Sequence, residues 1–481
     1  MSSQSQNRRR RTTVRSAVSW LAFAASATAQ RVVPVGFSKT NTPTGLSRRA
    51  SFSTTLINEK SAYFAKVQVG TPAQTVTLHV DTGSSDLWLL SETADLCNSI
   101  TLQQEWGQCV DTFDASKSST FEVVGDGDFK ITYVDETGAS GDYFTDNVSL
   151  GGGKTITGLQ MGLARKSTSN WGMLGIGMPG ALSSATEYPN IIDMMYNQKL
   201  ISTKAYSLYL DDYSAESGTI LFGGLDTDKF HGTLLTMPIV GNNVTGEVVY
   251  DHFTVPVTTI TAVGPQQNTS LFSNTASVSN EPLYVILDSG TSLTYLPSTV
   301  TNSLFKLLNT YDDTSSRGSG QILVDCDLRQ KSGLTISFQF NGPNGPVINV
   351  PATEFILDDL KSYISSGAIA VPSNLPWSKD RVCRMGIMPG DEQAPTYLIG
   401  DTFLRSAYVV YDLTNHEIGM AQSNVDSDSS KVVEIVDGIP AATGVPYKAK
   451  TNAGAGRTKK GWGGMAVGVA AVVGTLTLFG F

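Results

Sequence analysis

Short runs rich in Val, Ile, Thr, Tyr and Phe, separated by glycine and asparagine, fill most of the middle of the chain. Runs of this length and composition are typical of β-strands joined by tight turns. The clearest helical stretches are residues 191–199 and 300–308, and Pro297-Ser298 before the second is a helix start signal. The pattern predicts an all-β fold with few helices.

One pattern of an apolar strand followed by a polar loop occurs twice. Residues 76–80 lead into Asp81-Thr-Gly-Ser-Ser85, and residues 283–287 lead into Asp288-Ser-Gly-Thr-Ser292, with the two aspartates 207 positions apart. Downstream of each copy an apolar run ends on glycine, at 173–175 and at 398–400. This repeat predicts two similar lobes, each with one carboxylate at a strand-to-loop turn.

Two carboxylates held close together can hydrolyse a peptide bond without a metal or a covalent intermediate. Like charges about 3 Å apart cannot both ionise, so one group keeps a proton and acts as acid while the other acts as base. An isolated Asp-Thr-Gly is more often a turn than a catalyst, but two matched copies disfavour that interpretation. We expect glycines to leave room for the pair and hydroxyls to donate to its oxygens: Gly83 and Gly290, and Thr82, Ser84, Ser289 and Thr291.

The N-terminus has the layout of a secretory signal. Five arginines within residues 1–15 precede a mostly apolar stretch, 17–25, and the small residues Ala27-Thr-Ala29 suit signal peptidase. We predict a signal peptide over 1–29; a nuclear-type basic run or a disordered tail are the alternatives.

The C-terminus has the layout of a glycosylphosphatidylinositol (GPI) attachment signal. Residues 463–481 carry no charge, a basic spacer precedes them, and small residues stand before the spacer. We predict attachment at Asn452, with Gly454 as a second choice, removal of 453–481, and a stalk over 423–452. The alternative is a tail-anchored or single-pass helix.

A basic stretch without any acidic residue lies between the signal and the body of the chain. Arg48-Arg49 resembles a processing site, so we predict a propeptide over 30–49 with cleavage after Arg49. Removing 1–49 and 453–481 takes away 9 and 3 of the 34 basic residues and none of the 43 acidic ones. The net charge changes from −9 to −21. Such a body has few cations to repel one another in acid.

Four cysteines in a secreted chain indicate two disulfides, with three pairings open. Cys97 with Cys109 and Cys326 with Cys383 would keep each bridge within one half of the chain. Sequons at Asn147, Asn243 and Asn268 are candidate glycosylation sites, although sequons often arise by chance.

From Tyr63 to about Gln422 the sequence resembles the pepsin family of aspartic proteases. The matching segments are 69–74, 80–88, 129–133 with 138–141, 286–292, 218–226 and 397–405. With the predicted signal, propeptide and anchor, the nearest subgroup is the yapsin-like, GPI-anchored cell-surface enzymes of fungi.

The resemblance implies a bilobal fold with a central cleft, its lobes covering 50–240 and 241–422. It implies a catalytic dyad of Asp81 and Asp288, with Ser84 and Thr291 holding the two aspartates. Tyr133 would cover the substrate from a flap, and Trp88 would brace Tyr133 with its indole N–H. It also implies polypeptide substrates, inhibition by pepstatin, a monomer, no cofactor or metal, and no nucleic-acid partner.

The chain departs from the family in two places. Residues 91–109 look rearranged and longer, and the flap continues with Val134-Asp135-Glu136-Thr137, which is more acidic than in many relatives. Asp135 and Glu136 would favour basic residues near the scissile bond. The equal alternative is that both face solvent at a hairpin tip.

Other functions have weaker support. The four histidines form no His-Glu-x-x-His pattern, and the chain lacks a Gly-x-Ser-x-Gly elbow. Gly153-Lys154-Thr155 resembles the end of a phosphate loop, but Val148 stands where its first glycine belongs, so we expect a hairpin turn. The main rival is a catalytically silent, surface-anchored peptide-binding protein on the same fold.

Overall fold

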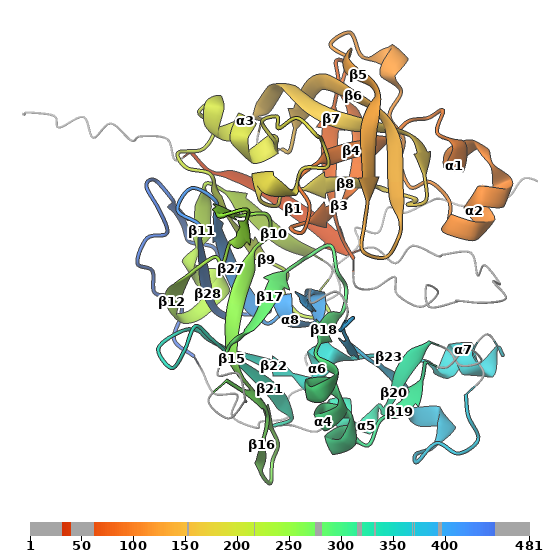
Figure 1. Ribbon diagram of the computed structural model, residues 1–481, viewed down its shortest axis with the longest axis vertical. Coiled ribbons are helices and arrows are strands. Elements are labelled where there is room, and N and C mark those ends of the chain that lie inside the picture. The colour runs from red at the N-terminus through yellow and green to blue at the C-terminus, as the bar shows by residue number, and fades with distance from the viewer. Residues whose placement is uncertain are drawn as a thin grey trace, which may run out of the picture. The chain divides into compact units, whose positions relative to one another are not determined.

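The structure is a computed structural model that describes residues 31–39 and 62–447, except 152, 216, 275–280, 315–319, 331–332, 368, 370 and 393–396. The predicted signal peptide, Arg49, Asn452 and the predicted tail lie outside these residues. Strands dominate what is described (Figure 1). The all-β prediction is therefore confirmed.

A sheet of 13 strands carries the first aspartate. Its central strands are β2 (Tyr63–Val69) and β3 (Gln74–Asp81), whose side chains alternate between the core and the opposite face. In sheet order the strands are β12 (Phe230–Pro238), β28 (Glu417–Ser423), β27 (Ala407–Asp412), β9 (Ala205–Tyr209), β10 (Ser217–Phe222), β1 (Val33–Lys39), β2, β3, β8 (Gly172–Gly175), β4 (Leu87–Leu90), β7 (Thr155–Ser167), β6 (Gly138–Ser149) and β5 (Glu122–Thr132).

The sheet takes strands from both ends of the chain. β27 pairs with β9 although their sequences are about 200 residues apart, and the two lie side by side in Figure 1. The predicted boundary at 240/241 therefore does not separate the sheets, because residues 407–423 complete the first one.

A second sheet, of eight strands, carries the other aspartate. It contains β22 (Val347–Pro351), β21 (Thr335–Phe340), β15 (Thr254–Val263), β17 (Leu283–Leu287), β26 (Tyr397–Ile399), β18 (Thr294–Leu296) and β25 (Ile387–Pro389), with β16 (Asn268–Ser273) on β15. Smaller sheets hold β11 (Gly224–Asp226) with β29 (Val432–Glu434), β13 (Asn242–Val244) with β14 (Glu247–Val249), and β19 (Tyr311–Asp313), β20 (Gln321–Asp325), β24 (Val382–Met385) and β23 (Ile356–Asp359).

The two apolar-glycine runs occupy matching places beside the two aspartate loops. β8 pairs in parallel with β3 and antiparallel with β4. β26 pairs in parallel with β17 and antiparallel with β18. In each lobe a strand from far along the chain therefore lies between the two arms of the aspartate loop.

Both predicted helices are present. α3 (Ile191–Asn197) begins with a capping box in which Asn190 and Asp193 satisfy each other's backbone N–H groups, and α4 (Ser298–Leu308) ends at Asn309 in a left-handed conformation. The pattern did not predict the short helices α1 (Asp95–Asn98), α2 (Ile100–Trp106), α5 (Asp327–Gln330), α6 (Ala352–Phe355), α7 (Lys361–Ser365) and α8 (Asp401–Leu404).

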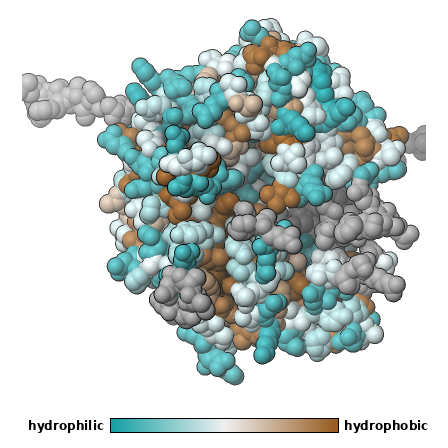
Figure 2. All heavy atoms as spheres, viewed as in Figure 1, coloured by the Kyte–Doolittle hydropathy of each residue, from teal (hydrophilic) through white to brown (hydrophobic). Residues whose placement is uncertain are grey.

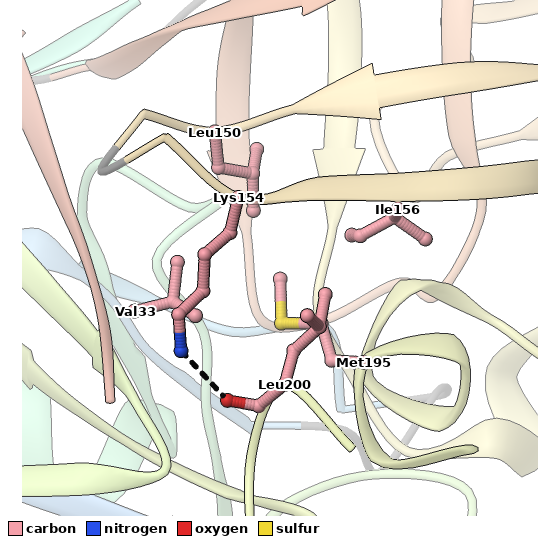
Figure 3. Close-up of a pocket in the computed structure, with 6 residues that line it drawn as sticks. All are labelled: Val33, Leu150, Lys154, Ile156, Met195 and Leu200. Atoms are coloured by element: carbon pink, nitrogen blue, oxygen red, sulfur yellow. Dashed lines mark hydrogen bonds between the residues drawn. The ribbon is translucent and has the colours of Figure 1, made fainter. Parts of the chain in front are cut away.

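Part of the predicted propeptide is a strand of the main sheet. β1 pairs with β10 over six residues and with β2 over three, and Val33 and Val35 are buried. Figure 3 shows a pocket lined by side chains that include Val33 of β1, Leu150, Ile156 and Met195, where Lys154 Nζ donates a 3.2 Å hydrogen bond to the Leu200 carbonyl. Lys154 follows the β6–β7 turn, which agrees with the hairpin expected there.

The prediction of a stalk over 423–452 is wrong for residues 423–445. β29 pairs with β11, the side chain of Ile435 is fully buried, and Thr443 and Val445 form bridges with β12. The polar composition suggested a solvated segment, but Val432, Val433 and Ile435 give it enough apolar surface to pack. This segment is not part of the two sheets that carry the aspartates, and it covers the edge strand β12.

Polar and apolar side chains are intermixed over the described part of the face in Figure 2. Among the described residues, no helix is both long and apolar enough to cross a membrane.

Candidate active site

Asp81 and Asp288 meet across two glycine loops. A Cβ atom on Gly83 would lie 2.7 Å from Asp288 Oδ1, and one on Gly290 would overlap Asp81 Oδ1. Only glycine leaves this space, because any other side chain would push the opposite carboxylate away. Gly83 N donates to Asp81 Oδ1 at 2.7 Å, and Gly290 N donates to Asp288 Oδ1 at 2.9 Å. The two lobes therefore bring the two carboxyl groups into one site with matching geometry.

The outer hydroxyls hold the outer carboxylate oxygens. Ser84 Oγ donates a short hydrogen bond to Asp81 Oδ2, and Thr291 Oγ1 donates to Asp288 Oδ2 at 2.5 Å. Each aspartate thus has one oxygen bonded to a backbone N–H and the other to a hydroxyl, which fixes the orientation of both carboxyl groups.

The expectation that Thr82 and Ser289 also donate to the carboxylates is wrong. Thr82 Oγ1 donates to the Leu287 carbonyl at 3.0 Å, and Ser289 Oγ donates to the Val80 carbonyl at 3.1 Å. Each hydroxyl also accepts the backbone N–H of the other residue, at 2.9 and 3.2 Å. These two hydroxyls link the loops of the two lobes to each other, because each side chain points across the lobe interface.

The electrostatic environment favours a proton on the pair. Burial, and then the neighbouring Asp288 carboxylate, raise the pKa of Asp81 well above that of an ordinary aspartate. The serine and glycine hydrogen bonds act in the opposite direction but are smaller. The site can therefore hold one proton and one negative charge at the same time, as a shared acid and base.

The β5–β6 hairpin extends over the site as a flap. Trp88, which is fully buried, donates its indole N–H to Tyr133 Oη at 2.8 Å. Burial, and next the charge of Asp81, raise the pKa of Tyr133, which keeps it a neutral phenol. Tyr133 N and the Thr137 carbonyl close the hairpin at 2.8 Å. The bracing role expected of Trp88 is present in the structure.

The acidic residues of the flap lie at its exposed tip. Val134, Asp135 and Glu136 are exposed, and Glu136 adopts a positive φ of 66°. Asp135 Oδ1 accepts hydrogen bonds from Thr137 N at 3.0 Å and Thr137 Oγ1 at 2.6 Å. The charge of Asp135 nevertheless influences His79 on β3 and Tyr295 on β18. Its carboxylate therefore lies within electrostatic range of both lobes.

A buried aspartate behind the flap was not singled out by the sequence pattern. Asp86 is fully buried and accepts hydrogen bonds from Ser183 N at 2.7 Å, Tyr188 Oη at 2.6 Å and Tyr143 Oη at 3.2 Å. Three donors compensate its burial. One sequence feature points to Asp86: it stands two residues before Trp88, between the aspartate loop and an apolar strand. A carboxylate in that position is buried and needs hydrogen-bond donors.

Both predicted disulfides are present, Cys97–Cys109 and Cys326–Cys383. The first links α1 to the segment that follows α2, and its cysteines pack against the cluster that contains Trp88 and Phe129. Among the predicted sequons, Asn243 and Asn268 are exposed, whereas Asn147 is half-buried within β6.

Two lobes that each deliver an aspartate to a shared site beneath a tyrosine-bearing flap define an aspartic protease. Residues 62–423 match the family model of eukaryotic aspartyl proteases, and the chain belongs to this family.

Named relatives agree with this assignment. The chain is 38% identical over 409 residues to the probable aspartic-type endopeptidase opsB of Aspergillus fumigatus, covering 83% of this chain and 77% of that protein. It is 32% identical over 402 residues to the aspartic proteinase yapsin-3 of Saccharomyces cerevisiae, covering 81% and 72%. The protein is an aspartic endopeptidase of the yapsin-like fungal group.

A solved structure supports the fold independently. The aspartic proteinase from Irpex lacteus matches 83% of this chain and 100% of its own chain, with a TM-score of 0.58 and 22% identity.

Proposed function

We propose that Asp81 and Asp288 are the catalytic pair of this endopeptidase and activate one water molecule between them. The ionised carboxylate takes a proton from the water as it attacks the peptide carbonyl, while the protonated carboxyl donates its proton to the carbonyl oxygen. As the C–N bond breaks, the carboxyl group that took the proton from water passes it to the amine nitrogen. The other carboxylate takes a proton back from a hydroxyl of the tetrahedral intermediate, so the pair again holds one proton. No covalent intermediate with the enzyme is needed.

The observation that carries this proposal is the mutual fit of each glycine against the opposite carboxylate. Gly83 faces Asp288 and Gly290 faces Asp81, so the pair is closely spaced only when both loops are in place. A structural ion pair would place a cation here, but these two acids are surrounded by hydroxyls and backbone N–H groups.

The test is hydrolysis of an unfolded protein near pH 4 by the purified, processed enzyme. Pepstatin and Asp81→Asn or Asp288→Asn are each expected to abolish cleavage, while Asp428→Asn, at an exposed aspartate, should leave it unchanged. Wild-type protein that is folded but cleaves nothing between pH 3 and 7 would instead support a silent peptide-binding protein.

We infer that the enzyme is secreted, acts best in acid and remains anchored to the cell surface. The N-terminal and C-terminal signals support the route, and the predicted mature net charge of −21 supports stability in acid. The raised pKa of Asp81 supports activity in acid, because it keeps the shared proton on the pair throughout the acid range.

The anchor is tested in cells that express the full chain. Phosphatidylinositol-specific phospholipase C should release active enzyme from the surface, and deletion of 453–481 should send it to the medium. Mass spectrometry of the mature termini should find cleavage after Arg49 and a modified Asn452. Retention of residues 463–481 in the mature protein would exclude this anchor.

We also propose that the acidic flap biases cleavage toward basic residues next to the scissile bond. Asp135 Oδ1 is occupied by Thr137, but its charge reaches both His79 and Tyr295, on opposite lobes. A partly dehydrated site strengthens such an attraction.

A peptide library provides the test for this bias. Lys or Arg should be enriched near the cleaved bond, and Asp135→Asn with Glu136→Gln should reduce that enrichment without loss of total activity. Asp128→Asn, on the exposed face of the flap strand β5, is the matched control. If the enrichment is absent, or the same in both variants, the two acids only face solvent.

A further inference from the structure

A buried histidine lies on the strand that carries the first catalytic aspartate. His79 is 6% exposed, and its Nε2 atom has no hydrogen-bond partner among the described residues. Successive side chains of a strand point to opposite faces, so His79 shares a face with Asp81. Leu78 and Val80 point the other way, into the main hydrophobic core. His79 therefore belongs to the active-site face of β3.

Two aromatic rings enclose the imidazole. The Phe64 ring on β2 lies 5.2 Å from it, the Trp171 ring just before β8 lies 5.9 Å away, and Phe64 and Trp171 contact each other edge to face at 5.3 Å. We call Phe64, His79 and Trp171 the aromatic box. It joins β3 to both neighbouring strands, since Phe64 pairs with His79 in β2 and Met173 pairs with His79 in β8.

The box does not provide a partner for a charged imidazole. Phe64, Trp171 and Met173 carry no charge, and Lys66, further along β2, is exposed. The acidic groups whose charge reaches His79 are Asp288, beyond Asp81 in the site, and Asp135 on the flap. Burial outweighs both and lowers the pKa of His79 to about 4. The ring is therefore neutral until the solution is strongly acidic.

We propose that protonation of His79 in acid displaces the active-site strand. When the imidazole takes up a proton, the aromatic box opens and β3 no longer holds Asp81 in place. An imidazolium held between two aromatic rings, with its Nε2 N–H lacking an acceptor among the described residues, is disfavoured unless the ring moves toward water. Because β3 ends at Asp81, movement at His79 disturbs the dyad directly. Protonation of His79 then lowers kcat/KM at acid pH, in addition to the loss of activity caused by protonation of the two aspartates.

The sign of the effect follows from linkage. An unfolded chain binds a proton at His79 near pH 6.5, whereas the folded chain resists it until about pH 4, so folding becomes less favourable as the pH falls through this window. Below it, the unfolding constant is raised roughly 300-fold by this one group. His79→Gln, which keeps a polar side chain but does not titrate, removes that contribution.

The experiment compares the purified enzyme with His79→Gln and His79→Leu between pH 3 and 7. The ratio of wild-type to variant unfolding constants, from denaturant titrations, should rise by roughly 200-fold from pH 7 to pH 3.5. The acid limb of kcat/KM should move to lower pH in both variants. His252→Gln, at a histidine whose side chain is 36% exposed beside Asp251, should leave the acid limb in place and change the unfolding ratio far less, since it affects only the pair with Asp251. A constant ratio and an unmoved acid limb would overturn the proposal.

A second measurement does not depend on the variants folding. The chain has four histidines, so a ring-labelled wild-type enzyme gives a histidine NMR spectrum that variants of His231, His252 and His416 can assign. The His79 signal should remain that of a neutral ring down to about pH 4.5. Reversible protonation near pH 6.5 with full activity retained would refute the proposal, even if both His79 variants fail to fold.

Discussion

Arg405 Nε donates a 2.5 Å hydrogen bond to Glu354 Oε2, and both side chains are buried. Arg405 also donates from Nη2 to the Glu354 carbonyl at 2.9 Å, and its guanidinium lies 5.0 Å from the ring of Tyr213. Arg405 follows α8, near the second aspartate loop, whereas Tyr213 belongs to the β9–β10 loop of the first sheet. This ion pair therefore lies where the two lobes meet.

Breaking this pair should strongly destabilise the fold. Glu354→Gln removes the carboxylate that is hydrogen-bonded to the buried guanidinium and leaves Asp401 as its remaining acidic neighbour, which costs about 3 kcal/mol of unfolding free energy. Urea denaturation at pH 6 measures the change. Lys117→Gln, which breaks the surface pair with Asp114, is the control and should have little effect. Equal stabilities for Glu354→Gln and wild type would show that the pair is replaceable.

A single methyl group at Gly290 should inactivate the enzyme while leaving it folded. The new Cβ of Gly290→Ala overlaps Asp81 Oδ1, so the carboxyl group must move. A displacement near 1 Å lowers kcat/KM by about 100-fold or more. Gly264→Ala, whose Cβ would meet only the Gln267 carbonyl at 3.3 Å, is the control. Normal activity in Gly290→Ala would mean that the two loops are not so closely spaced during catalysis.

Trp88 and Tyr133 should contribute to activity jointly, through the hydrogen bond between them. Trp88→Phe and Tyr133→Phe each remove the bond and are each expected to lower kcat/KM by about 3- to 10-fold, because a neutral hydrogen bond is worth roughly 1 kcal/mol. The double variant should be little worse than either single one. Strictly multiplicative losses in this double-mutant cycle would show that the bond is unimportant for the flap.

The aspartate loops and the flap could be predicted from sequence because their chemistry is local. An apolar strand, an aspartate, a glycine and hydroxyls stand next to one another, and the repeat at Asp288 gives the same signal twice. The cross-lobe bonds of Thr82 and Ser289 could not be predicted, since they depend on how two distant loops face each other.

Long-range partners explain the other differences. Glu354 and Arg405 are 51 positions apart, and nothing local distinguishes this buried glutamate from an exposed one. The polar composition of the segment ending at Val445 predicts a stalk, yet Asp226 accepts hydrogen bonds from Ser430 and Lys431, and Ile435 is buried. Such packing depends on the surface that the segment contacts, and that surface is formed by residues far away in the sequence.

Glycan occupancy should follow exposure. Asn243, in the β13–β14 hairpin, and Asn268, at the start of β16, are exposed and accessible to the glycosylating enzyme. Asn147 is half-buried, and its side chain bonds to Thr71 Oγ1 at 3.3 Å and Gly158 N at 3.4 Å. Glycopeptide mass spectrometry of secreted enzyme should find high occupancy at Asn243 and Asn268 and low occupancy at Asn147. The reverse order would mean that attachment precedes the folding of β6.

The proton shared by the dyad should make the folded enzyme less stable as the pH rises. Burial and Asp288 raise the pKa of Asp81 above its unfolded value, so over that interval the folded state binds a proton that the unfolded chain has released. The stabilisation that this proton provides must then decrease as the pH rises. It is complete only below the pKa of Asp81 in the unfolded chain, which is about 4. Asp81→Asn cannot titrate, so its melting temperature should fall less than that of wild type between pH 4 and pH 8. Asp428→Asn, which keeps the dyad, should follow the wild-type curve. Parallel curves for Asp81→Asn and wild type would mean that the pair releases its proton at an ordinary pH.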